Sequence, residues 1–414
     1  MMSGRKRVAF ITNGAFPVPA VRGGAVEALT EMILKENEIF GEMDLTLFSI
    51  YDPLALKAGV RYPSVHFEFI KPRKHWIALD KAFHYVAYDI LDYVNHLSFK
   101  TTFQRIDYLY QCAIKLHEND YDAVIFENQM ASLWVLKYQN NAEKYAGKYY
   151  FHLHNHPEKY AKAEQLAKDA KKVICVSRFI GNAFAKNIGA EYTDEKFAVL
   201  KNVVDETLFD PANVTEADVQ AVREKLNVQD RKVILFLGRL MEGKGVRELM
   251  QAFKKLNRDD CVLVIVGSLN FGDNARSPYE DELYGLVKEI GEDKVIFTGY
   301  VDHDQVPVYY CMGDVVCMPS TCEDAAPLAV IECLRMQRPL ITTTMGGIPE
   351  YADETCAVML ENDEHLADSI CSAVDDLLND PQKCAQLQEG ARLISRDRTL
   401  SSFYHNLIDI LNEE

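Results

Sequence analysis

The sequence predicts an α/β protein of two domains, each built around a parallel β-sheet. With 414 residues, the chain is longer than the roughly 250–300 residues that one hydrophobic core serves. Short apolar runs such as 233–237 and 261–266 show no polar–apolar alternation, which is typical of strands buried on both faces. A glycine or polar loop and then a helical pattern follow these runs. This repeated order indicates Rossmann-like, doubly wound sheets.

The expected strands follow from these runs in chain order. In the first half they lie at 7–12, 45–50, 65–70, 121–126, 148–154, 172–176 and 197–200, and in the second half at 233–237, 261–267, 294–301, 314–318 and 339–344. The first helix is expected from the glycine pair at 23–24 to about residue 35, and an amphipathic helix is expected at 400–411. Two amphipathic surface helices are expected within 364–395.

Charge and cysteine usage exclude several classes of protein. The net charge is −17, and it divides into +2 for residues 1–200 and −19 for residues 201–414. Such an acidic chain is a poor nucleic-acid binder, because phosphate contacts supply most non-specific affinity. The ten cysteines form no CxxC pair, so we expect reduced core residues, not disulfides or zinc ligands. No apolar run reaches the roughly 20 residues that cross a bilayer, and a cytoplasmic protein is expected.

Residues 71–100 mix basic and aromatic side chains, among them Lys74, Trp76, Phe83 and Tyr88. A cluster of this kind suits contact with anionic lipid, and it predicts a peripheral membrane contact at the inner face of the membrane. The alternative is an ordinary helix with one packed face and one solvated face.

The stretch 318–332 holds the main candidate site. A strand stops at Pro319, and a helix is expected to begin near Pro327, because proline is favoured in a first helical turn. The free N–H groups around Leu328 then form a site for an anion such as a diphosphate. Asp324 lies just before this helix and Glu332 eight positions later. The two carboxylates are too far apart to share a metal, but they can contact two parts of one elongated ligand.

Two cations lie upstream in a glycine-rich loop after the strand at 233–237. Arg239 can form a bidentate contact with phosphate oxygens, and Lys244 adds a compact charge five positions later. The sequence predicts that both converge on one diphosphate. The alternative is that either is a solvated loop cation.

These motifs together resemble the donor-binding half of the retaining glycosyltransferases of the GT-B fold, family 4. The family has glycine–arginine after a strand, lysine–glycine before the next helix, and two acidic residues separated by seven others. Here the acidic pair is Asp324 and Glu332, with aspartate where glutamate is usual, and Pro327 stands where glycine is common. The resemblance implies two Rossmann-like domains facing each other across a cleft: an acceptor domain at 1–208 and a nucleotide-sugar domain at 209–397, with a final helix at 398–414 packed back on the first domain.

In the first domain the resemblance points to a glycine loop and a histidine. Gly23 and Gly24 let the backbone approach a ligand closely, and the family's loop there faces sugar and acceptor. The family also has a histidine at the strand end after 148, next to the donor sugar. His154 with Asn155 is the best match, and His156 is the second choice.

The same strand carries His152, and alternation predicts that the three histidines at 152, 154 and 156 share one side. A metal site there would need a carboxylate that the sequence does not identify, so no metal is expected.

The remaining roles are also implied by the resemblance. Arg239, Lys244 and the N–H groups near Leu328 bind the diphosphate, and Glu332 binds the ribose hydroxyls. The resemblance further suggests that Gly267, Tyr300 and Val301 hold the nucleoside, and that Asp324 and His154 are the catalytic pair around the sugar. Residues 302–304 spell Asp-His-Asp, a metal-nucleotide motif of another fold, which is here expected to cap a helix.

The expected activity is metal-independent, retaining transfer from a nucleoside diphosphate-sugar to a carbohydrate or lipid-linked acceptor. UDP is the default nucleotide, and polysaccharide or glycolipid assembly is the expected setting. No cofactor beyond the co-substrate is expected. In the expected mechanism the acceptor attacks the face from which the phosphate departs, and that phosphate takes the proton. The alternatives are a nucleotide-sugar epimerase on the same fold and an inert nucleotide-sugar-binding protein.

Overall fold

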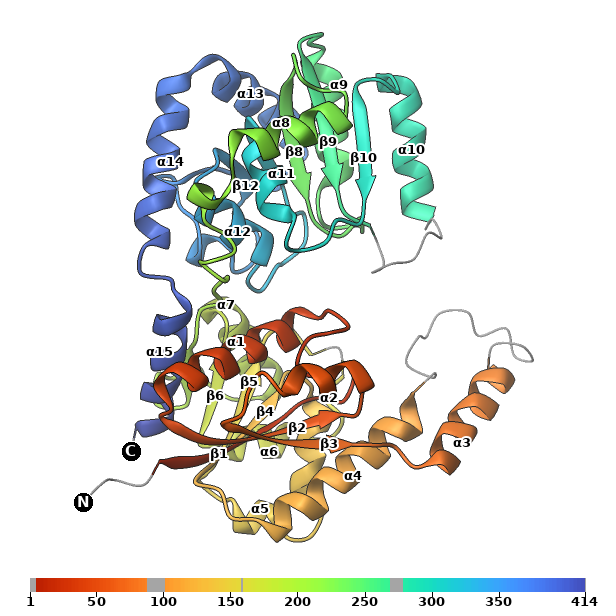
Figure 1. Cartoon of the computed structure of the whole chain (residues 1–414), viewed down its shortest axis with the longest axis vertical. Coiled ribbons are helices and arrows are strands. Elements are labelled where there is room, and N and C mark those ends of the chain that lie inside the picture. The colour runs from red at the N-terminus through yellow and green to blue at the C-terminus, as the bar shows by residue number, and fades with distance from the viewer. Residues whose placement is uncertain (1–4, 88–100, 158, 269–277, 414) are drawn as a thin grey trace. The chain divides into compact units, whose positions relative to one another are not determined.

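The computed structural model describes residues 5–87, 101–157, 159–268 and 278–413. The chain divides into two compact units, each with one sheet and helices packed around it (Figure 1). Unit 1 comprises Met1–Lys201 with Phe403–Glu414, and unit 2 comprises Asn202–Ser402. The sequence placed the division at 206–212 and the return of the chain to the first domain at about 398.

The sheet of unit 1 has seven parallel strands in the order β3-β2-β1-β4-β5-β6-β7. Their bounds are β1 Lys6–Ile11, β2 Met43–Ile50, β3 Val65–Ile70, β4 Ala123–Glu127, β5 Tyr149–Leu153, β6 Lys172–Cys175 and β7 Phe197–Val199. The strand order reverses between β1 and β4, where Ile11 lies opposite Phe126. Doubly wound sheets bind ligands beyond the carboxyl ends of the strands at such a reversal.

Helices of unit 1 follow most of these strands. They are α1 Ala25–Phe40, α2 Pro53–Gly59, α3 Lys74–Tyr85, α4 Thr102–Glu118, α5 Asn141–Lys144, α6 Glu164–Asp169, α7 Arg178–Ile188 and α15 Leu400–Asn412, with a 3-10 helix at Met130–Lys137. The helix α1 extends beyond the expected end near residue 35 and stops at Gly41, whose φ of 63° is left-handed. Glycine adopts that conformation without the steric cost that other residues meet.

The C-terminal helix α15 lies beside α1 (Figure 1). The Tyr404 hydroxyl donates to Asn37 Oδ1 at 2.7 Å, and Lys6 Nζ donates to the Leu411 carbonyl at 2.5 Å. Phe403, Leu407 and Leu411 are buried. This segment therefore joins unit 1 through an apolar face and these two hydrogen bonds, of which the one from Tyr404 is buried, although it follows unit 2 in the chain.

The sheet of unit 2 has six parallel strands in the order β10-β9-β8-β11-β12-β13. Their bounds are β8 Lys232–Leu237, β9 Cys261–Val266, β10 Val295–Gly299, β11 Val315–Met318, β12 Leu340–Thr343 and β13 Ala357–Leu360. The order reverses between β8 and β11, which pair at Ile234 with Val315. The expected strands are thus confirmed in both units, and β13 is added at one edge.

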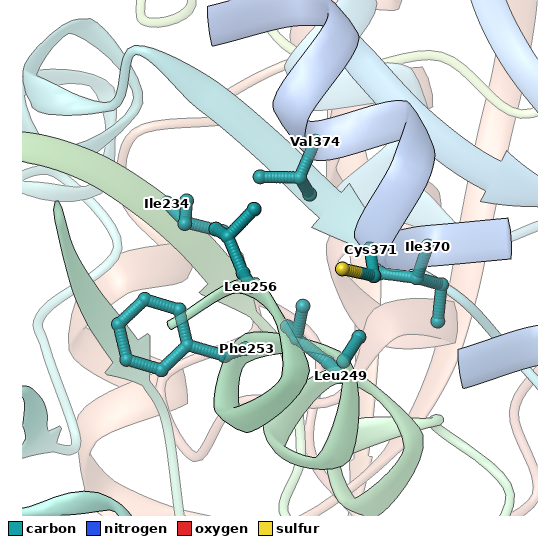
Figure 2. A pocket seen from close by; sticks show the side chains of 8 residues that line it. Ile234, Leu249, Phe253, Leu256, Ile370, Cys371 and Val374 are labelled. Carbon is teal, nitrogen blue, oxygen red and sulfur yellow. The ribbon is translucent and has the colours of Figure 1, made fainter. Parts of the chain in front are cut away.

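The helices of unit 2 cover this sheet. They are α8 Glu216–Lys225, α9 Val246–Leu256, α10 Pro278–Ile290, α11 Val306–Met312, α12 Leu328–Arg335, α13 Leu366–Asn379 and α14 Pro381–Ser395, with 3-10 turns at Pro211–Asn213 and Ile348–Glu350. Figure 2 shows where α9 and α13 meet over β8: Leu249, Phe253, Ile370 and Val374 converge around Ile234. The space between them is too small for a water molecule, so it belongs to the packed core and is no ligand site.

Among the described residues, no helix is both long enough and apolar enough to cross a bilayer. The segment predicted to contact membrane, 71–100, is only partly covered: α3 belongs to it, whereas 88–100 lie outside the described residues. Exposed apolar side chains of α3 and the turn after it include Leu79, Phe83, Tyr85 and Val86.

Candidate functional site

The reversal of strand order in unit 2 brings together two loops that are eighty residues apart in sequence. The first follows β8 and contains Gly243, Lys244 and Gly245. The second follows β11 and runs from Pro319 to Asp324. Because β8 and β11 are neighbours in a parallel sheet, both loops leave the sheet at the same edge.

Glycines allow these loops to touch backbone to backbone. A Cβ on Gly245, whose φ is 75°, would lie 1.8 Å from the Pro319 carbonyl oxygen. The Gly243 carbonyl accepts the N–H groups of Thr321 and Cys322 at 2.9 and 3.1 Å. A third loop closes on the second, since the Asp324 carbonyl accepts the Gly347 N–H at 2.7 Å. Lys244 and Asp324 are therefore held by three backbone segments in direct contact.

Within this arrangement, Lys244 Nζ forms an ion pair with Asp324 Oδ2. Both side chains are largely shielded, with exposed fractions of 21% and 15%. The sequence analysis assigned Lys244 to the diphosphate and Asp324 to the sugar of one ligand. The structure places these two side chains in contact.

The other expected diphosphate ligand, Arg239, lies just after β8 and is exposed. Within the described ranges it forms no ion pair. A solvated guanidinium beside a shielded lysine offers two different kinds of phosphate contact, one bidentate and one point-like.

The helix α12 begins at Leu328, one residue after Pro327, and no side chain of the described residues caps its first turn. Its N–H groups are therefore open to an external acceptor, as expected for an anion site. Glu332 lies one turn further along and is buried. Its Oε1 is 3.1 Å from His303 Nε2, and its Oε2 is 3.0 Å from the Tyr310 hydroxyl.

His303 is a residue that the sequence analysis missed, because Asp-His-Asp at 302–304 was interpreted as a helix cap. That interpretation was wrong: α11 begins at Val306 after Gln305, and no side chain caps it. The central histidine, not the flanking aspartates, contacts Glu332, the carboxylate that is expected to bind the nucleoside. The contact could have been suspected only from the position of this turn after β10, on the edge where ligands bind.

The expected nucleoside residues lie at the ends of β9 and β10. Gly267 donates its N–H to the Gly299 carbonyl at 3.0 Å, and a Cβ on Gly267 would lie 1.9 Å from the Gly238 carbonyl oxygen. Tyr300 is 40% exposed, and Val301 is half-buried. The end of β8 thus contacts the end of β9, and a surface tyrosine follows β10.

In unit 1, a buried triad lies at the ends of β4 and β5. Glu127 Oε2 is 2.9 Å from His154 Nε2 and 3.2 Å from His152 Nδ1. All three side chains are at most 5% exposed. The carboxylate that the sequence did not identify is therefore Glu127, placed opposite His152 by the register of the two strands.

The two histidines flanking Glu127 hold the pKa of its carboxyl well below the usual range, at about 2, against the opposing effect of burial. Burial, together with the neighbouring His152, lowers the pKa of His154 to about 4. His154 is therefore a neutral imidazole at neutral pH, and its Nε2–H donates to Glu127. The remaining Nδ1 is buried and without a hydrogen-bond partner in the described structure, so it is available as an acceptor.

Glu127, His152 and His154 are also the residues that could hold a metal ion, since their ligand atoms lie within 4.8 Å of one another. A metal-bound histidine normally donates its second N–H to a partner. The second nitrogens, His152 Nε2 and His154 Nδ1, are both buried, and neither has such a partner among the described residues. The donor set therefore fits a hydrogen-bonded triad better than a metal site.

The third histidine does not join this cluster. His156 is exposed, and its Nε2 lies 2.9 Å from Asn187 Nδ2. The expectation that three histidines share one side was wrong, because β5 ends at Leu153 and the chain turns there. Asn155 is exposed, and its N–H donates to Asn128 Oδ1 at 3.2 Å.

The glycine pair of unit 1 opens α1. Gly23 and Gly24 have φ values of 76° and 102°, which favour glycine. The Glu27 carboxylate folds back here, so that a Cβ on Gly24 would lie 2.1 Å from Glu27 Oε2. Burial, with a contribution from the Glu127 charge, raises the pKa of Glu27 to about 7. Sequence reasoning identified the glycines but missed this buried acid.

Known proteins resemble the chain over nearly its whole length. Spore coat protein SA of Bacillus subtilis (strain 168) is 25% identical over 396 residues, which is 93% of each chain. The putative glycosyltransferase YtcC of the same organism is 23% identical over 391 residues, covering 93% of this chain and 86% of YtcC.

Solved structures share the fold. A glycosyltransferase from Rickettsia africae ESF-5 gives a TM-score of 0.75 at 18% identity over 99% of this chain and 98% of that one. Anabaena Alr3699/HepE in complex with UDP-glucose gives 0.72 at 18% identity over 98% and 99%. The chain therefore has the GT-B fold, and its residues 218–394 match the family described as Glycosyl transferases group 1.

Proposed function

We propose that the protein is a retaining glycosyltransferase of family 4 that moves a sugar, of hexosyl type, from a nucleoside diphosphate-sugar to a hydroxyl of a glycan or lipid-linked acceptor. The observation that carries the proposal is the meeting of Lys244 and Asp324 on loops held together by glycine contacts beside the uncapped start of α12. A nucleoside diphosphate-sugar supplies a phosphate for Lys244 and sugar hydroxyls for Asp324. The family match over 218–394 covers the same residues.

The donor would be held as follows. Arg239, Lys244 and the N–H groups around Leu328 bind the diphosphate, Glu332 accepts the ribose hydroxyls, and the backbone at Gly267, Tyr300 and Val301 contacts the base. Charge develops on the departing phosphate in the transition state, and fixed cations with helix N–H groups stabilise it. No divalent metal is then required. UDP is the proposed nucleotide, supported by the neighbours crystallised with UDP or UDP-glucose.

Around the sugar, Asp324 and the neutral His154 each offer an acceptor for a hydroxyl hydrogen. His154 is oriented for this by Glu127, which fixes the Nε2–H tautomer and leaves Nδ1 without a partner in the described part of the chain. No nucleophilic carboxylate pair of the glycosidase type is proposed. The acceptor instead attacks from the leaving-group face, and the phosphate takes its proton. Gly23, Gly24, Asn155 and His156 are assigned to the sugar and acceptor loop.

A thermal-shift screen tests donor binding with UDP-, GDP- and ADP-sugars, each with and without EDTA. Lys244→Ala and Arg239→Ala should lose the shift and reduce turnover by about 100-fold or more. Lys254→Ala is the matched control, because Lys254 is an exposed lysine of unit 2 paired with Glu289. Full activity in the first two variants would refute the donor site, and loss of the shift with EDTA would refute metal independence.

A second candidate is a nucleotide-sugar-binding protein without transferase activity, because one relative over 93% of the chain is named a spore coat protein. It would bind a nucleotide-sugar but neither transfer nor hydrolyse the sugar. Proton NMR of a reaction with donor alone separates these cases, and it also detects an epimerase by interconversion of the sugar. Retention of the anomeric configuration in a transfer product would support the first proposal.

We also propose peripheral contact of residues 71–100 with anionic membranes, supported by the exposed apolar side chains of α3. Flotation with vesicles containing phosphatidylglycerol tests it, with phosphatidylcholine vesicles as the control. Leu79→Asp should weaken binding to the anionic vesicles.

A further inference from the structure

The carboxylate of Glu332 is held mainly by one side chain. Its Oε1 accepts from His303 Nε2 at 3.1 Å. Its Oε2 lies 3.0 Å from the Tyr310 hydroxyl, but that hydroxyl is also 2.9 Å from the Ala329 carbonyl. One hydroxyl proton serves both acceptors, so Tyr310 gives Glu332 at most a shared hydrogen bond.

This geometry leaves acceptor capacity on both carboxylate oxygens. A carboxylate has about four lone-pair sites, and His303 and Tyr310, its side-chain partners among the described residues, use at most one on each oxygen. One site per oxygen therefore remains, which matches two adjacent hydroxyl groups such as the 2′- and 3′-hydroxyls of ribose. A carboxylate free to rotate would lose side-chain entropy on binding such a diol, and the His303 bond removes that freedom beforehand.

The position of His303 allows it both to orient the Glu332 carboxylate and to change its own protonation state. Its side chain is 60% exposed, and its ring lies 5.2 Å from that of Phe209. The charged groups facing it are Glu332 of α12, Asp304 of its own turn and Asp205 of the segment between β7 and α8. Together they raise the pKa of the imidazole. The electrostatic environment of His303 is therefore negative, and no cation of the described residues contributes to the rise in its pKa.

We propose that His303 is a positioning residue for the donor nucleoside: it orients Glu332 toward the ribose hydroxyls, and its protonated form strengthens donor binding. The proposal rests on the proposed function, in which Glu332 accepts the ribose and the start of the same helix binds the diphosphate. An anionic donor bound at α12 favours the imidazolium over the neutral ring. By linkage, protonation of His303 raises donor affinity by the same factor.

The test measures the dissociation constant of UDP-glucose by calorimetry at about pH 6 and about pH 8.5. The diphosphate diester does not titrate in this range, so it contributes no pH dependence of its own. Wild-type affinity should fall by roughly three- to tenfold as the pH rises, because the neutral imidazole no longer attracts the anionic donor and orients Glu332 through a weaker, uncharged hydrogen bond. Calorimetry near neutral pH in two buffers of different ionisation enthalpy should show proton uptake on binding.

Two variants separate orientation from charge. His303→Gln keeps an N–H donor but no titratable group, so its affinity should stay near the high-pH wild-type value at both pH values, with no proton uptake. His303→Phe keeps the ring beside Phe209 but loses the donor, and it should bind about tenfold more weakly than His303→Gln. His365→Gln is the matched control, an exposed histidine of unit 2 paired with Glu364, and should behave as wild type.

A ligand change tests the link to ribose. Replacing UDP-glucose by its 2′-deoxy analogue should weaken binding in the wild type, and by a smaller factor in His303→Phe, whose carboxylate is no longer oriented. A merely structural role would give the same factor in both. Equal factors, or proton uptake that persists in His303→Gln, would overturn the inference while leaving the proposed function intact. If UDP-, GDP- and ADP-sugars all fail to bind the wild type, the proposed function falls, and this inference with it.

Discussion

Gly245→Ala is predicted to destabilise unit 2 through a single steric contact. Two costs add: alanine at a φ of 75° costs about 1–2 kcal/mol, and its Cβ would lie 1.8 Å from the Pro319 carbonyl oxygen. A backbone oxygen cannot rotate away as a side chain can, so the contact adds about 1–3 kcal/mol of overpacking strain. The free energy of unfolding should therefore fall by about 2–5 kcal/mol.

Gly147→Ala carries the first cost alone, so comparing it with Gly245→Ala isolates the second. Gly147 has a φ of 71°, and a Cβ there would meet no heavy atom of the described residues within 4 Å beyond its chain neighbours. This variant should lose only the conformational part, about 1–2 kcal/mol. The difference between the two variants then measures the contact that holds the Lys244 loop against the loop after β11.

The assay must report each unit separately. The two tryptophans, Trp76 and Trp134, both lie in unit 1, so fluorescence does not follow unit 2. Hydrogen exchange measured by mass spectrometry gives an opening free energy for β8 peptides of unit 2 and β4 peptides of unit 1. Equal losses in the two variants would refute the steric argument. Donor affinity should also fall in Gly245→Ala, because Lys244 is displaced with its loop.

Three further predictions concern other contacts. His154→Gln should flatten the acid sensitivity of unit 1: the folded His154 resists protonation down to about pH 4 while the unfolded one protonates near pH 6.5, so wild type loses about 3 kcal/mol over that window. Tryptophan-monitored urea unfolding from pH 7 to pH 4 checks it, and an unchanged slope would contradict it. Tyr404→Phe removes the 2.7 Å bond to Asn37 and should cost about 1–2 kcal/mol by the same assay at pH 7; a change below about 0.5 kcal/mol would count against it. Asp324→Asn should bind UDP more tightly than wild type in calorimetry, because Lys244 loses its carboxylate partner, and yet transfer sugar more slowly; weaker UDP binding would argue against the pair.

Sequence patterns predicted the fold because buried parallel strands leave a simple signal. Runs such as 233–237 and 261–266 have no polar residue, since helices cover both faces of the sheet. The end of α1 was harder to predict. Glu36 and Asn37 are polar but buried, and Asn37 bonds to Met43 and to Tyr404, which is 367 positions away. In a local pattern such polar residues indicate the end of a helix. The pattern does not contain the partner that allows their burial, because that partner is remote in sequence.

The candidate site was predictable where its residues follow strands directly. Arg239, Lys244 and Asp324 stand in loops that the strand order brings to one edge. Glu127 was not connected to the histidines, because that contact depends on the register between β4 and β5, which no local pattern carries. His303 lies in a turn whose side-chain direction is set only by the packing of α11 against α12.

The two cations of the proposed donor site differ in whether they are already paired, and this difference sets the order in which they would contact a diphosphate. Arg239 is exposed, and within the described residues it has no ion pair, so it can meet an incoming diphosphate without breaking a contact. Lys244 is already bound to Asp324, and a phosphate oxygen can reach its ammonium fully only by competing with that carboxylate. On the proposed function, the phosphate that captures Lys244 thereby releases Asp324 to accept a sugar hydroxyl. Donor binding itself would then form the contact with the sugar, and free sugar or free UDP alone would leave one half of the pair without its ligand.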